Sequence, residues 1–135
     1  MRASTQLEDL VQVIMMDAST WIDRTADCLA DLGDAELQDR AWLEGEGDEV
    51  SSFTEAFYAL SDFDLPGFIE RCEGWGYESD LAVALSDYWA DLRTFVDGFV
   101  GMPSPEVVLA HPAWDSLRSR ARVLSERVRA GKPRR

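Results

Sequence analysis

Two pairs of acidic residues are spaced so that they could hold a divalent metal ion. Glu70 and Glu73 are three residues apart, and Asp87 and Asp91 are four apart, so each pair would share one face of a helix. Two facing helices with such pairs can bind Mg²⁺ and direct attack on a phosphate group. One interpretation of the chain is therefore a metal-dependent nucleotide phosphohydrolase that uses these four carboxylates.

The order of these acids, ExxE at residues 70–73 and DxxxD at residues 87–91, resembles that of the all-α nucleotide pyrophosphohydrolases. The pattern of that family is ExxE followed by ExxD. The resemblance covers residues 70–91 and implies bound Mg²⁺ or Mn²⁺ and nucleoside triphosphate substrates. The alternative, which we favour, is a solvated acidic face, because 26 of the 135 residues are Asp or Glu.

Residues 62–73 also have part of the spacing of an EF-hand calcium loop. Asp62, Asp64 and Glu73 stand at positions 1, 3 and 12 of such a loop, and Gly67 stands at position 6. Pro66 at position 5 removes a side-chain ligand. We therefore predict a turn and a proline-initiated helix here, without a calcium site.

A row of aspartates along the first helix suggests a binding surface. Asp23, Asp27 and Asp31 recur every four residues, away from the apolar side of that helix. Like charges one turn apart destabilise a helix by a few tenths of a kcal/mol, so one interpretation of their presence is a surface aimed at a cationic partner. The alternative, which we favour for these three residues, is a solubilising face, or one neutralised by the chain's own Arg-rich last helix.

The acidic segment that follows, residues 34–49, would extend this surface and add an aromatic anchor, Trp42. The alternative for Trp42, which we favour for this side chain, is burial under a loop. The predicted binding residues are Asp23, Asp27, Asp31, Asp34, Glu36, Asp39, Trp42, Glu44, Glu46, Asp48 and Glu49.

Other catalytic constellations are missing from the sequence. The chain has one histidine, His111, which precedes Pro112 and has no motif to supply a catalytic partner. There is no GxSxG motif, no phosphate-binding GxxxxGK[ST] motif and no zinc-ligand spacing. Cys28 and Cys72 form no CxxC, and we expect two buried reduced thiols. We expect no cofactor.

Apolar spacing predicts helices throughout the chain. Apolar residues recur at alternating steps of three and four along residues 5–32, 79–97 and 112–130, which is typical of helices that pack along a neighbour. Residues 35–43, 52–60, 65–72 and 104–110 are the candidates for shorter helices. The predicted fold class is all-α: a single-domain helical bundle over residues 1–131, with three long amphipathic helices, two or three short ones and a frayed basic tail at residues 132–135.

The formal net charge of −13 is divided unevenly along the chain. Residues 1–117 hold 25 acidic and five basic residues, whereas residues 118–135 hold one acidic and eight basic residues. A body with a net charge of −20 argues against binding to nucleic acid and favours a basic protein as partner. No apolar run is long enough to span a membrane, and residues 1–6 lack the start of a signal peptide, so we expect a cytoplasmic protein.

We therefore predict, in preference to an enzyme, a small acidic helical protein that acts through protein–protein interaction, of the inhibitor, immunity-protein or antitoxin type. The phosphohydrolase above is one alternative. The other is a self-associating scaffold, a homodimer in which the apolar seam of residues 7–32 pairs between subunits.

Overall fold

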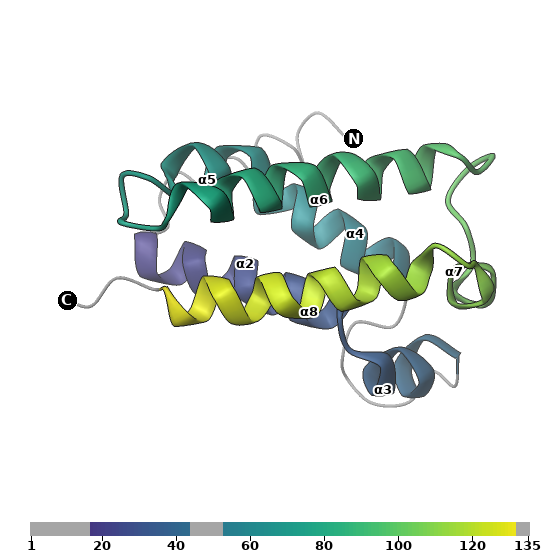
Figure 1. The fold of residues 1–135 in the computed structure, drawn as a ribbon. Coiled ribbons are helices and arrows are strands. Elements are labelled where there is room, and N and C mark those ends of the chain that lie inside the picture. The colour runs from purple at the N-terminus through teal and green to yellow at the C-terminus, as the bar shows by residue number, and fades with distance from the viewer. Residues whose placement is uncertain (1–16, 44–52, 132–135) are drawn as a thin grey trace, which may run out of the picture.

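The computed structural model describes residues 17–43 and 53–131, and these are helical with no strand, as the sequence predicts. Residues 5–16 of the first predicted helix, Glu44, Glu46, Asp48 and Glu49 of the predicted surface, and the basic tail lie outside the described residues. The helices are α2 (Ala18–Leu32), α3 (Ala35–Leu37), the π-helix η1 (Gln38–Leu43), α4 (Phe53–Asp62), α5 (Leu65–Arg71), α6 (Ser79–Asp97), α7 (Pro105–Ala110) and α8 (Trp114–Ala130) (Figure 1).

Asp17, which lies inside the first predicted helix, is not helical. This residue has an extended backbone, with φ −71° and ψ 163°, and its carboxylate accepts a hydrogen bond from the Thr20 backbone N–H at 2.7 Å. An aspartate in this position satisfies an otherwise unpaired N–H and starts a helix. The prediction of one continuous helix over residues 5–32 is therefore wrong, although the end at Gly33 is correct.

The later helices begin and end at capping residues, prolines and glycines of the sequence. Asp64, in a left-handed conformation with φ 56°, accepts a hydrogen bond from the Gly67 N–H and starts α5, with Pro66 in its first turn. Ser104 caps α7 in the same way, and Pro105 is its first residue. Gly98 follows the last residue of α6. These are the positions at which the sequence predicts the helices to begin and end.

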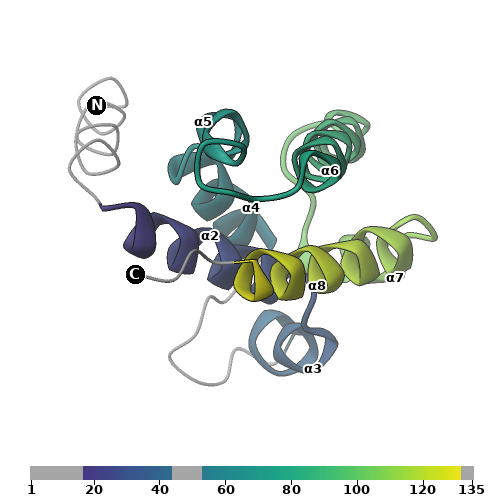
Figure 2. The ribbon, with the colours of Figure 1, turned by 60° about the vertical axis from the view of Figure 1, so that its left-hand side comes forward.

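Helices α2 and α8 pack against each other and form the middle of the molecule (Figures 1 and 2). Helices α4, α5 and α6 lie on one side of this pair, and α3 with η1 lies on the other. Helix α6 runs antiparallel to α8 along its length, and α7 connects their far ends. Within the described ranges, no helix is both long enough and apolar enough to cross a membrane.

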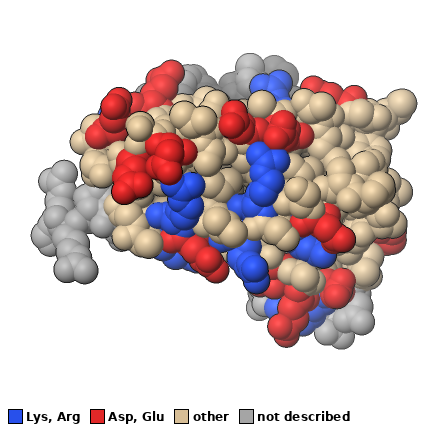
Figure 3. All heavy atoms as spheres, viewed as in Figure 1, with Lys and Arg blue, Asp and Glu red and all other residues tan. Residues whose placement is uncertain are grey.

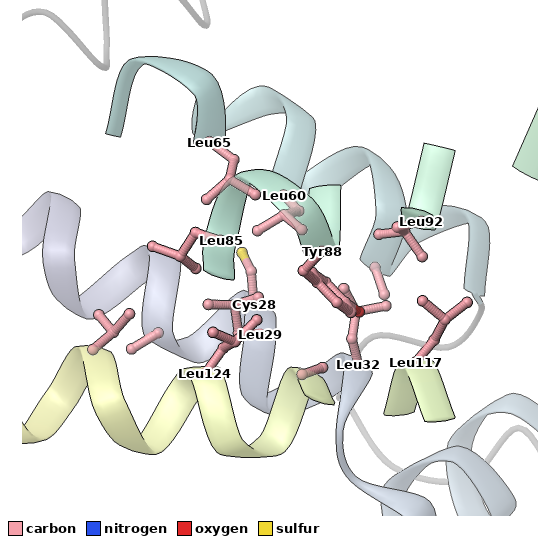
Figure 4. Packing of buried hydrophobic residues seen from close by; sticks show 14 of the residues in the cluster. Cys28, Leu29, Leu32, Leu60, Leu65, Leu85, Tyr88, Leu92, Leu117 and Leu124 are labelled. Atoms are coloured by element: carbon pink, nitrogen blue, oxygen red, sulfur yellow. The ribbon is translucent and has the colours of Figure 1, made fainter. Parts of the chain in front are cut away.

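The core lies between α2, α4, α5, α6 and α8. Buried side chains from all five helices converge there (Figure 4), and the labelled ones are Cys28, Leu29, Leu32, Leu60, Leu65, Leu85, Tyr88, Leu92, Leu117 and Leu124. Burying a side chain of this size stabilises a fold by about 1.5–3 kcal/mol. The apolar stripes predicted for α6 and α8 are thus the faces that the chain buries.

Candidate functional site

The predicted acid row lies on the surface side of α2. Asp23 and Asp27 are exposed, and Asp31 is half-buried at the end of the helix. Asp27 has an intramolecular role, because its Oδ1 accepts a hydrogen bond from Nη2 of Arg129 in α8 at 2.6 Å. Asp27 therefore helps to join α2 to α8.

A buried hydroxyl continues this link between α2 and α8. Ser125 donates a hydrogen bond to the Ala26 carbonyl at 2.9 Å and accepts one from Nη1 of Arg129 at 3.2 Å. Arg129 thus bridges an exposed carboxylate and a buried hydroxyl. Neither Ser125 nor this bridge is predicted by the sequence pattern, since both depend on how the two helices are aligned.

The acids of the next segment are all exposed where the structure describes them, and one of them also caps a helix. Asp34 starts α3, and its Oδ1 accepts a hydrogen bond from the Leu37 N–H at 3.0 Å. Glu36 and Asp39 are exposed on α3 and η1. Together with Asp23 and Asp27 on α2, these residues are the exposed acids of the predicted surface in the described part of the chain.

Trp42 is not on this surface. Its side chain is only 5% exposed, and its ring lies 6.0 Å from that of Phe53 and 6.1 Å from that of Trp114. The interpretation of Trp42 as an exposed aromatic anchor is therefore wrong, and its burial, the other interpretation, is confirmed. The physical reason is that α3 and η1 turn Leu37, Ala41 and Trp42 toward the other helices, so the acidic residues form only the outer side of the segment.

Gln38 is a buried polar residue that the sequence analysis did not identify. Its Nε2 donates to the carbonyls of Asp31 and Leu32, at 3.0 and 2.9 Å, and its Oε1 accepts from Trp114 Nε1 at 3.1 Å. A fully buried amide needs such partners to offset the loss of water. Its position four residues before Trp42, on the same helical face, is the signal that could have identified it.

The arginines of α8 pair with the chain's own acids. Arg120 contacts Asp91 at 2.9 Å and Arg127 contacts Asp80 at 3.2 Å, both across to α6. Figure 3 shows the basic side chains of this face lying between acidic ones. Each pair is exposed and contributes about 0–1 kcal/mol, so the last helix lowers the repulsion within its own fold without strong individual bonds.

The four carboxylates of the metal-site interpretation do not come together. Helix α5 ends at Arg71, so Glu70 is helical whereas Glu73 lies in the following turn, and Asp91 is paired with Arg120. In the part of the chain that the structure describes, no group of three or more His, Cys, Asp or Glu side chains could hold a metal ion. Helix α5 also occupies most of the segment that an EF-hand loop would need.

The apolar seam of the self-association interpretation faces inward where the structure describes it. The α2 part of the seam, Trp21, Thr25, Cys28 and Leu32, is buried within the chain itself. It is therefore not available to a second subunit.

The remaining reactive side chains have structural roles. Nδ1 of His111 accepts a hydrogen bond from the Ala113 N–H at 3.1 Å, and its ring packs edge-on against Phe95. Burial raises the pKa of Cys28 to about 12, with Asp31 and Asp27 adding to the effect, and it raises the pKa of Cys72 to about 11. Both thiols therefore stay protonated at neutral pH and are poor nucleophiles.

An open groove of about 390 Å³ lies between α6 and α8. Its lining residues are Ala84, Asp87, Ser119, Arg120, Val123, Leu124 and Arg127. Both arginines are the ones already paired with α6. The groove therefore combines an apolar floor with neutralised charges and does not bring a nucleophile and a base together.

The chain matches no protein-family model, no curated protein and no solved structure.

Proposed function

We propose that this protein binds a basic protein partner through an acidic surface formed by α2, α3 and η1. The exposed acids Asp23, Glu36 and Asp39 define this acidic surface. The observation that carries the proposal is the charge of residues 17–43, which hold seven acidic and only two basic residues. Two arginines of α8, Arg120 and Arg127, pair with α6 on the other side of the molecule, so they do not neutralise it.

A surface of this kind acts mainly on the rate of association. Concentrated negative charge steers a basic partner toward the surface and can raise the association rate by roughly 10–1,000-fold at low salt. Because Trp42 is buried, the acidic surface lacks the aromatic anchor that would slow dissociation. The proposal therefore describes a fast, strongly salt-dependent interaction, of the type used by small acidic inhibitors, immunity proteins and antitoxins.

The scaffold in this proposal is a single-domain bundle built on the three longest described helices, α2, α6 and α8. The Asp27–Arg129 and Gln38–Trp114 contacts support it, because they fix α2 and η1 to α8. The acidic surface is thereby held on a preformed framework.

Two charge-matched variants test the proposal. The surface variant is Asp23→Lys, Glu36→Lys and Asp39→Lys; the control is Glu70→Lys, Glu73→Lys and Asp97→Lys, which reverses three exposed acids elsewhere. Both change the net charge from −13 to −7. Capture from the native host with the wild-type chain identifies a basic partner, and stopped-flow kinetics then measure its association with each variant.

We expect the surface variant to slow association by roughly ten-fold or more at low salt and the control to slow it far less, because steering depends on local charge. Equal slowing by both variants would show that net charge alone matters, and the acidic surface would then be rejected. Failure to capture any basic protein would reject the partner class.

A further inference from the structure

The groove between α6 and α8 lies where α6 presents a small side chain to its neighbour. Asp80, Ala84, Asp87 and Asp91 follow one another at steps of four, three and four residues, so they share one face of α6. Ala84 has only a methyl group and leaves room between the acids. The volume of about 390 Å³ is in the range of small-ligand sites, which is roughly 300–1,000 Å³.

The floor of the groove is apolar and is supported by the core. Ala84, Val123 and Leu124 line it, and Leu124 is a buried core residue. Val123 is 47% exposed, so a ligand that covers it removes apolar surface from water. In Figure 3 uncharged surface lies between the basic side chains of this face. The groove therefore offers a preformed apolar contact to a ligand of small size.

The two arginines of the groove are held in place by the chain itself. Arg120 contacts Asp91 at 2.9 Å, and its guanidinium carbon lies 5.4 Å from the centre of the Tyr88 ring. Arg127 contacts Asp80 at 3.2 Å. Each arginine side chain is only 36% exposed. The positive charge of each arginine is thus offset by a carboxylate of α6, and an anion would have to displace that carboxylate.

The remaining charged residue of the lining is Asp87. It is exposed, and within the described part of the chain it has no hydrogen bond or ion pair. Since the two arginines are offset by Asp80 and Asp91, the charge left over at the groove is negative. The net charge of −13 adds to the negative potential. The groove therefore attracts a cation and repels an anion.

We propose that this groove binds a small organic cation that has an apolar chain and a single positive charge, such as an alkylammonium ion. The apolar chain covers Val123 and the rest of the floor, and the positive charge lies beside the carboxylate of Asp87. A carboxylate with the same chain meets the same floor but is repelled by Asp87. The groove is lined by α6 and α8 and contains none of the acids of the surface proposed for the basic protein partner.

NMR titration of the full chain with octylammonium, octanoate and ethylammonium tests the proposal. We expect octylammonium to bind saturably and to shift the backbone signals of Ala84, Asp87 and Val123. Octanoate, which has the same chain length and the opposite charge, should bind at least five-fold more weakly. Ethylammonium has the charge without the long chain and should not saturate at millimolar concentration.

Two pairs of variants separate the groove from the overall charge and from the fold. Asp87→Asn should weaken octylammonium binding at least three-fold, whereas Asp97→Asn, at an exposed acid of α6 outside the groove, should leave it within two-fold. Both change the net charge from −13 to −12. Val123→Ser should weaken binding at least three-fold, and Val83→Ser, at a valine that is 59% exposed outside the lining, should not.

Several outcomes overturn the proposal: octanoate binding as tightly as octylammonium, no saturable octylammonium binding at millimolar concentration, shifts confined to residues outside the groove, or equal weakening by both members of a variant pair. Ala84→Leu fills the groove without changing any charge and should weaken octylammonium binding at least ten-fold. Unchanged binding in Ala84→Leu also overturns the proposal. Should that variant fail to fold, the exposed Val123 and Val83 pair decides, because neither substitution disturbs the core.

Discussion

The indole Nε1–H of Trp114 donates a hydrogen bond to Oε1 of Gln38 at 3.1 Å, although the two residues are 76 positions apart in sequence. The amide of Gln38 also donates to the last carbonyls of α2. One buried side chain therefore joins α2, η1 and the first turn of α8. A change of this one polar group therefore affects three helices at once.

Replacement of Gln38 by Leu should destabilise the protein strongly. The substitution removes the partner of the Trp114 N–H and the Gln38 hydrogen bond of the buried Leu32 carbonyl, and each buried polar group left unpaired costs about 1–3 kcal/mol. Urea unfolding should therefore show a loss of about 2 kcal/mol or more. Asp39→Leu, at the exposed neighbouring position, is the control and should change stability by less than about 1 kcal/mol. Equal losses in both variants would contradict the structural role of Gln38.

Gly33→Ala should destabilise the fold even though the backbone there suits alanine. Gly33 has φ −98° and ψ 0°, and at such positions alanine normally stabilises by about 0.4–1 kcal/mol. A Cβ on Gly33, however, would lie 2.6 Å from the backbone nitrogen of Arg122. We expect a loss of about 1–3 kcal/mol as α2 and α8 are forced apart.

Gly98→Ala provides the matched comparison for that experiment. It is also the residue after a long helix, with φ −73°, but its nearest neighbour to an added Cβ is the Phe95 carbonyl at 3.4 Å. Thermal unfolding should show an unchanged or slightly raised midpoint. A lower stability for Gly98→Ala than for Gly33→Ala would contradict the close approach of α2 to α8.

The contacts around Arg129 should differ in their contribution to stability. Asp27 and Arg129 are both more than half exposed, so a double-mutant cycle between them should give a coupling below about 1 kcal/mol that falls with salt. Ser125→Ala removes a buried donor from the Ala26 carbonyl and should cost about 1 kcal/mol or more at any salt concentration. If the loss of stability in Ser125→Ala depended on salt, the substitution would be acting through the Asp27–Arg129 ion pair instead.

Stability should fall at alkaline pH, beginning near pH 9. Burial raises the pKa of Cys28 from 9.0 to about 12 and that of Cys72 from 9.0 to about 11. Above pH 9 the unfolded chain releases these protons while the folded chain keeps them, so the free energy of unfolding decreases as pH rises toward 11. Urea unfolding from pH 8 to pH 10.5 measures this slope.

The matching chemical test uses a thiol reagent at pH 8. Both cysteines should react slowly in the folded protein and quickly in denaturant, because only the unfolded chain exposes them and ionises them readily. In the Cys28→Ala variant, the free energy of unfolding should decrease less steeply as the pH rises above 9. An unchanged slope in that variant would show that other groups, such as Tyr77, dominate.

The all-helical class and most helix ends could be predicted from the sequence, because they depend on local signals. Ser104 with Pro105, and Gly98 after the last turn of α6, act on their immediate neighbours. The extended backbone of Asp17 could not be predicted in this way, because apolar residues continue at helical spacing on both sides of it in the sequence. At Asp17 the local capping hydrogen bond, and not that spacing, decides where α2 begins.

The candidate site was harder to predict because it depends on how the helices are aligned. The acidic composition of residues 34–49 indicates an exposed segment and gives no sign that Gln38 and Trp42 are buried. Both side chains are buried against Trp114 of α8, which is distant in sequence. Similarly, no pattern within α8 indicates that Arg120 would pair with Asp91 whereas Arg129 would pair with Asp27. Such pairings depend on how far α8 is shifted along α6 and α2 in the folded protein.

The π-helix η1 has a consequence for how relatives of this chain could be recognised. A π-turn holds about one residue more than an α-turn, so residues 38–43 accommodate a residue that a regular helix would not need. Deletion of one residue here would restore the α-helical pitch, but it would rotate Trp42 relative to Gln38, so that the two side chains would no longer share a face. We therefore expect a relative that lacks one residue in this segment to have lost either the buried amide or the indole. A relative that aligns here without a gap should keep both side chains.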